Sequence, residues 1–85
     1  MVPSSVAQVK GLGFNSRLFD QINSREFEEV FDADVVWLDH RDVFVVRGAM
    51  KSATNDYPLC VDVYAMDGDN VGEFLGRHVD LGAGV

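Results

Sequence analysis

The chain has 85 residues, of which 14 are acidic and seven basic, so its formal net charge is −7. Hydrophobic residues make up 47% of it, which is enough for a core and argues against intrinsic disorder. A chain this short is expected to form one domain, residues 1–85, with little material left to wall an enzyme cleft. The acidic balance argues against direct binding to nucleic acid or to anionic membranes, because both repel a negative surface.

The cysteine content and the apolar runs indicate the compartment. Cys60 is the single cysteine, whereas a small secreted domain is usually held by several disulfides. No apolar run approaches the roughly 20 residues of a membrane-spanning helix. The N-terminus lacks a basic stretch followed by an apolar block, so no signal peptide is predicted. These features predict a cytoplasmic protein.

The first third of the chain is predicted to be helical after a loose start. Glycines interrupt residues 1–13, which form either a loose segment or a short N-terminal strand, and residues 81–85 are expected to be loose as well. Residues 15–32 are predicted to form one bent helix or two short ones. Asn15 or Ser16 is expected to cap the first and Asn23 or Ser24 the second, and Asn23 followed by Glu26 fits the spacing of a capping box. The apolar residues of the second part fall at i, i+3 and i+4, which is one face of a helix: Phe27, Val30 and Phe31.

The rest of the chain is predicted to form strands. Two β-branched and aromatic runs, 35–38 and 43–46, flank the polar residues 39–42 and predict a hairpin. Residues 48–58 are expected to form a loop, and residues 67–70 a tight turn. The strand 71–75, extending as far as Val79, follows that turn.

Residues 59–66 give the clearest strand, because apolar side chains alternate with others. The face with Leu59, Val61, Val63 and Ala65 is expected to meet the core. The mixed face is expected to be partly wet: Cys60, Asp62, Tyr64 and Met66.

Together these elements predict an α+β fold, in which an N-terminal helical segment packs on an antiparallel sheet of about four strands. Phe27, Val30 and Phe31 would contact one face of the sheet. An aromatic patch on the second face is a further expectation, made of Trp37, Phe44 and Tyr64.

Catalytic and metal-binding patterns are weak in this sequence. Residues 67–72 match an EF-hand loop in part, but Val71 and His78 occupy positions that need oxygen ligands, and a tight hairpin explains the same residues. The serines and Cys60 lack a neighbouring base or a nucleophile elbow. No enzyme activity and no cofactor are therefore predicted. The alternative is a small metal-binding domain or enzyme that uses His40, His78 and nearby aspartates.

The acidic segment 26–34 supports a binding function. The plain interpretation of its carboxylates is a solvated face that keeps the protein soluble. The sharper hypothesis is an inhibitor or accessory subunit that docks on a basic surface of a larger protein. Its contact residues would be these carboxylates and two aromatic anchors: Glu26, Glu28, Glu29, Asp32, Asp34, Trp37 and Tyr64.

Two other interpretations of the surface remain open. The carboxylates could imitate the phosphates of nucleic acid, and the chain is similar in general character to the small acidic inhibitors that bacteriophages direct against host nucleic-acid machinery. Alternatively, the domain is structural and forms a homodimer through an exposed sheet edge, since a small core gains stability by association.

Overall fold

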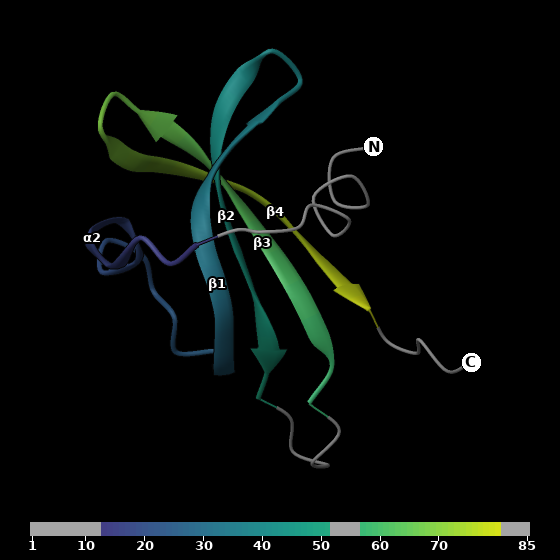
Figure 1. The fold of residues 1–85 in the computed structure, drawn as a ribbon. Coiled ribbons are helices and arrows are strands. Elements are labelled where there is room, and N and C mark those ends of the chain that lie inside the picture. The colour runs from purple at the N-terminus through teal and green to yellow at the C-terminus, as the bar shows by residue number, and fades with distance from the viewer. Residues whose placement is uncertain (1–12, 52–56, 81–85) are drawn as a thin grey trace.

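One curved antiparallel sheet makes up most of the part of the chain that the structure describes. The computed structural model describes residues 13–51 and 57–80; the predicted loose ends and the optional N-terminal strand lie outside these ranges, apart from Gly13. The helix α2 (Ser16–Phe19) precedes four strands: β1 (Phe27–Leu38), β2 (Arg41–Met50), β3 (Leu59–Asp67) and β4 (Asn70–Asp80). The strands lie in the order β1-β2-β3-β4, and the two hairpin ends point in different directions (Figure 1). The predicted four-stranded antiparallel sheet is confirmed.

The predicted helical segment is confirmed only at its start. Asn15 caps α2, since its side chain accepts a hydrogen bond from the Leu18 amide at 3.0 Å, but the helix ends at Phe19. Asn23 accepts a hydrogen bond from the Arg25 amide in a turn instead of capping a second helix. The prediction of helix over residues 27–32 is wrong, because β1 begins at Phe27.

Two β-bulges explain this error. The pairing of β1 with β2 shifts between Phe27 and Glu29 and again between Val30 and Asp32, so each step inserts one extra residue. Phe27, Val30 and Ala33 consequently reach the same face of the sheet at intervals of three. An interval of three is also typical of a helix face, which is why the apolar pattern of a bulged strand imitates a helix.

Gly48 on β2 allows the bulged strand to approach closely. A Cβ at this position would lie 2.2 Å from the Glu29 carbonyl oxygen and 3.0 Å from the Val30 Cα. Both atoms belong to backbone and cannot turn aside as a side chain does. The expected loop 48–58 is therefore partly wrong: β2 continues through Gly48 to Met50.

Replacing Gly48 with Ala is expected to lower the free energy of unfolding by about 2 kcal/mol, because the new methyl group collides with backbone. Gly76→Ala is the matched control, since a Cβ there meets no atom within 4 Å. It should be neutral or stabilising by up to about 1 kcal/mol. Urea denaturation of both variants measures the difference, and equal midpoints would show that the bulge tolerates a side chain opposite it.

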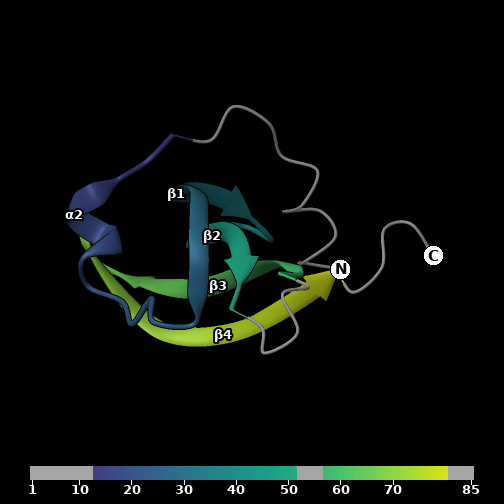
Figure 2. The same ribbon diagram turned by 90° about the horizontal axis from the view of Figure 1, so that it is seen from below.

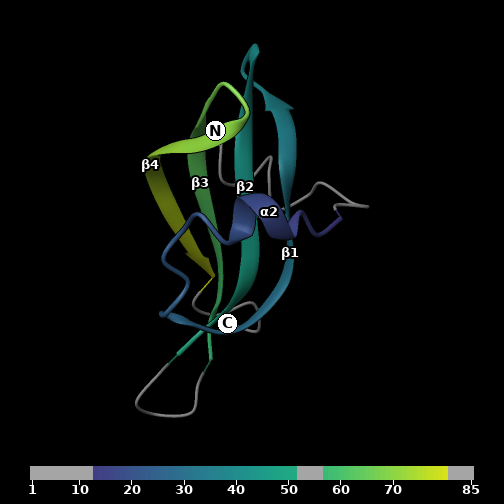
Figure 3. The same ribbon diagram turned by 90° about the vertical axis from the view of Figure 1, so that its left-hand side faces the viewer.

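Residues 13–26, here called the strap, cover one face of the sheet (Figure 3). The strap begins beside β1, where the Asn15 amide donates to the Ala33 carbonyl at 2.7 Å. It then crosses to the β3–β4 turn, where the Gln21 side chain accepts from the Val71 amide at 2.8 Å. Figure 2 shows the sheet curving beneath α2. The core on this face contains Leu18, Phe27, Ala33, Phe44, Val46 and Cys60.

The opposite face of the sheet carries a second buried cluster, formed by Val43, Val45, Val61 and Val63. The prediction for β3 is therefore correct for its central valines. Leu59 on the same face is 48% exposed. The expectation that the alternate face of β3 is partly wet is wrong at Cys60 and Asp62, which are only 2% and 1% exposed, because this face packs under the strap.

Asp62 can be buried because Arg77 neutralises it. The two residues face each other in the β3–β4 register, and the guanidinium donates two hydrogen bonds to the carboxylate, at 2.7 and 2.9 Å. These bonds raise the pKa of Arg77. The remaining nitrogen, Nη1, lies 3.0 Å from a carboxylate oxygen of Glu26 at the end of the strap. The guanidinium that neutralises the buried Asp62 thus also binds the exposed Glu26 and links the strap to the sheet.

Arg77→Met is expected to lower the free energy of unfolding by about 3–5 kcal/mol, because it leaves the Asp62 carboxylate buried without its counter-ion. Glu26→Gln removes an exposed carboxylate from the same guanidinium and should cost less than about 1 kcal/mol. The double variant Asp62→Leu/Arg77→Met should recover most of the loss. Chemical denaturation of the three proteins tests this order, and a small effect of Arg77→Met would mean that Asp62 does not depend on it.

Candidate protein-binding surface

Three of the five predicted carboxylates have structural partners. Asp32 is buried and forms a bidentate pair with Arg47 on β2, with one bond of 2.7 Å. Asp34 is half-buried and accepts hydrogen bonds from the amides of Gly13 and Val35. Glu26 is exposed, but it binds Arg77. These carboxylates hold the fold together and are poorly placed to meet a partner.

Glu28 and Glu29 are the exposed remainder of the acidic segment, at the beginning of β1. Eight residues of extended strand separate Glu29 from Trp37, which corresponds to about 25 Å. A typical interface of about 800 Å² per partner is roughly 30 Å across. The two ends of β1 therefore lie near opposite limits of a single contact area.

The two predicted aromatic anchors differ in exposure. Trp37 is 67% exposed, the highest value among the exposed large hydrophobic side chains. Tyr64 is half-buried, with its ring between those of Phe44 and Phe74, at centroid distances of 6.4 and 5.3 Å. The aromatic patch expected on the second face of the sheet is wrong, because Phe44 is fully buried and packs with Tyr64 in the core on the α2 face. Trp37, at the end of the first hairpin, is the exposed one of the three.

The end of the β1–β2 hairpin brings Trp37 close to carboxylates. The strands join through a two-residue turn, Asp39 and His40, and this turn places Trp37 directly opposite Asp42. Asp39, His40, Arg41 and Asp42 are all exposed. We call these four residues and Trp37 the hairpin-end surface. The sequence prediction did not include Asp42, although centring the turn on 39–40 would have paired it with Trp37.

The turn itself has an uncommon composition. Asp39 and His40 have φ angles of 51° and 66°, in the left-handed region where Gly and Asn are favoured. Two positive φ values in a two-residue hairpin correspond to a type I′ turn, for which Asn-Gly is the preferred sequence. The β3–β4 turn, by contrast, uses Gly68 at its positive φ of 61°. The first hairpin thus keeps polar side chains at a conformational cost.

The double substitution Asp39→Asn/His40→Gly is expected to raise the free energy of unfolding by about 1 kcal/mol, because both residues then suit the left-handed region. Thermal and urea unfolding provide the measurement. Arg41→Gln serves as a control at the same hairpin end, since it changes the charge and leaves the turn backbone alone. If the double variant is no more stable than the wild type, Asp39 and His40 adopt the left-handed conformation without a measurable cost in stability.

The candidate catalytic and metal-binding residues are not assembled into a site. Within residues 13–51 and 57–80, no group of three or more His, Cys, Asp or Glu side chains is placed to hold a metal ion. His40 lies in the turn of the first hairpin. His78 on β4 lies level with Arg47 on β2, because both residues pair with Val61 on β3. Six residues along β2, about 20 Å, separate the two positions.

Two further features oppose the alternative chemistry. Burial and the nearby Asp62 carboxylate raise the pKa of Cys60 to about 11, so the thiolate that a nucleophile requires is disfavoured at neutral pH. In the loop 67–70, Asn70 is engaged by the strap, since its side chain accepts from Gln21 at 3.1 Å. Through this hydrogen bond, the loop holds the strap against the second hairpin.

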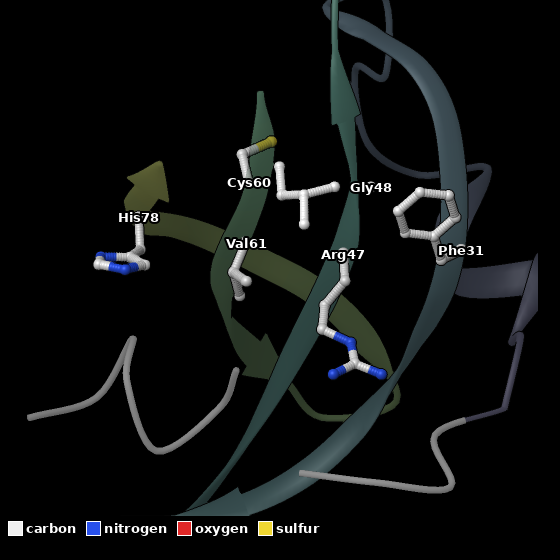
Figure 4. A pocket seen from close by; sticks show the side chains of 7 residues that line it. Phe31, Arg47, Gly48, Cys60, Val61 and His78 are labelled. Atoms are coloured by element: carbon white, nitrogen blue, oxygen red, sulfur yellow. The ribbon is translucent and has the colours of Figure 1, made fainter. Parts of the chain in front are cut away.

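A hollow of about 250 Å³ lies at the other end of the sheet. Figure 4 shows Phe31 of β1, Arg47 of β2, Val61 of β3 and His78 of β4 around it. Its one guanidinium, that of Arg47, binds Asp32, which raises the pKa of Arg47. Because this cation already serves the fold, the hollow is a poor receptor for an anion.

No helix in the described part of the chain is long and apolar enough to cross a membrane. No protein-family model matches the chain, and neither a curated protein nor a solved structure matches it significantly. The hairpin-end surface, with its exposed tryptophan and carboxylates, is therefore the strongest guide to function.

Proposed function

We propose that the protein is a non-catalytic binding module, an inhibitor or accessory subunit that docks on a basic surface of a larger protein. The observation that carries this proposal is the exposure of Trp37 directly opposite Asp42. Tryptophan is among the residues that contribute most to binding energy at interfaces. A neighbouring carboxylate supplies the polar, charge-selective border that such an anchor usually has.

The charge of the molecule supports a basic partner. The net charge of −7 speeds the encounter with a positive surface and opposes association with acidic ones. Asp39 and Asp42 supply this charge next to the aromatic anchor, and both are exposed. The predicted contacts through Glu28 and Glu29 belong to a second, separate part of the surface.

Mimicry of nucleic acid has less support than simple docking. That form of the proposal needs a series of available carboxylates over residues 26–34, yet Glu26, Asp32 and Asp34 already bind groups of the protein itself. This leaves Glu28 and Glu29, and two carboxylates can imitate only a short run of phosphates. A contact built on Trp37 does not depend on phosphate-like spacing.

Self-association through a sheet edge is the alternative, and the edges offer it little support. β1 contains two bulges, and the strap forms a bridge to it between Phe14 and Ala33. On β4, the pairing shifts between Val63 and Tyr64 and again between Tyr64 and Met66. Bulges twist an edge away from a flat pairing partner, so natural edge strands use them against association.

The proposal includes a cytoplasmic location and no catalysis. A single buried, free cysteine suits a reducing compartment. The raised pKa of Cys60 and the separation of His40 from His78 both favour a binding role over a reactive one.

The test is capture from cell lysate at low salt on immobilised wild-type protein, followed by stepwise elution with salt. We expect a basic protein whose capture falls at least tenfold with Trp37→Ala and severalfold with Asp39→Asn/Asp42→Asn. The matched control is Glu28→Gln/Glu29→Gln, which removes the same number of charges at the other end of β1. It should retain the partner.

Either of two results would contradict the proposal. Capture that survives both hairpin-end variants and fails with Glu28→Gln/Glu29→Gln would move the contact to the acidic beginning of β1. A wild-type protein that retains nothing and sediments as a dimer would favour self-association. Folding of each variant is checked by its urea midpoint.

A further inference from the structure

A second hollow, of about 350 Å³, adjoins the hairpin-end surface. It lies on the face of the sheet opposite α2, where Val43 and Val63 sit side by side with Leu38 and Leu75. The first hairpin contributes Leu38, Asp39, Arg41 and Val43, and the second contributes Val63, Leu75 and Gly76. The hollow therefore lies between the two hairpins, whose ends diverge in Figure 1.

The chemistry of this hollow is apolar inside and charged at the border. Val43 and Val63 are almost completely buried, whereas Leu75 is 41% exposed. Asp39 and Arg41 are exposed and supply the polar groups. A volume of about 350 Å³ is at the lower end of the range for ligand sites, so it suits one or two side chains better than a large cofactor.

We propose that this hollow receives an apolar side chain from a partner segment that also carries Lys or Arg. The inference rests on the proposed function and names the partner chemistry for the same end of the molecule. Hydrophobic burial supplies the anchor, and a cation beside it meets the carboxylate of Asp39. Asp42 is exposed between the hollow-lining residues Arg41 and Val43, and the exposed Glu73 lies two residues before Leu75, so both add to the negative potential.

Charge decides between this occupant and a second copy of the chain. The border of the hollow carries one carboxylate and one guanidinium, but a second copy has the same net charge of −7 as the whole chain, so two copies repel each other as they approach. A basic segment gains from the same field. Trp37 lies at the same hairpin end but on the α2 face of the sheet, so a partner that fills the hollow reaches the tryptophan only around the end of the hairpin.

Gly76 makes the hollow testable without disturbing the fold. A Cβ at Gly76 meets no atom within 4 Å, and the residue has no positive φ that a side chain would strain. A larger side chain at this position fills the hollow from one side. Gly76→Leu should therefore block an incoming side chain and leave the stability unchanged or higher, and Gly76→Ala should block it only in part.

The experiment selects binders of the full wild-type chain from a random twelve-residue peptide library displayed on phage. We expect enriched peptides that combine Leu, Ile or Phe with adjacent Lys or Arg. The affinity of one synthetic representative should fall at least tenfold for Gly76→Leu and less for Gly76→Ala. Urea midpoints confirm that both variants are folded.

The other outcomes overturn the inference. Peptides without an apolar residue next to a basic one, peptides that bind Gly76→Leu as well as the wild type, or no enrichment at all would each do so. Peptides lost with Trp37→Ala and kept with Gly76→Leu would reject the hollow and leave the proposed function standing. A dimer that Gly76→Leu dissociates would assign the hollow to a second copy.

Discussion

The buried carboxylate of Asp62 is the constraint around which the β3–β4 hairpin and the end of the strap are arranged. A charge inside a small core is tolerated only with a counter-ion and satisfied hydrogen bonds, and Arg77 provides both. This need fixes the register of β3 against β4. Arg77 also binds Glu26, so the same guanidinium contacts the end of the strap just before β1.

The first hairpin repeats this device on the other face of the sheet. Asp32 and Arg47 face each other across β1 and β2, and each Asp–Arg pair joins residues 15 positions apart. The pairs are internally neutral, so they leave the net charge of −7 to the rest of the chain. The acidic excess therefore belongs mainly to exposed residues, where it influences which partners approach.

The recognition features of the described residues lie at the hairpin ends of the sheet. The first hairpin end combines an exposed Trp37, a turn with two positive φ angles and, on the opposite face, an apolar hollow bordered by the second hairpin. Conformational cost kept at a surface site is a common feature of binding sites. The rigid antiparallel pairing behind the turn holds these features in fixed relative positions.

By itself, the sequence determined the four-stranded antiparallel sheet and the Asn15 cap, because alternation and side-chain chemistry act over a few residues. The sequence also identified Trp37 as an aromatic anchor and showed that the chain as a whole is acidic. Only the tertiary structure decided that residues 27–32 form a bulged strand, since the bulges depend on the partner strand and on Gly48. Likewise, the roles of Asp32 and Asp62 depend on arginines 15 residues away, and local pattern carries no information on such pairing.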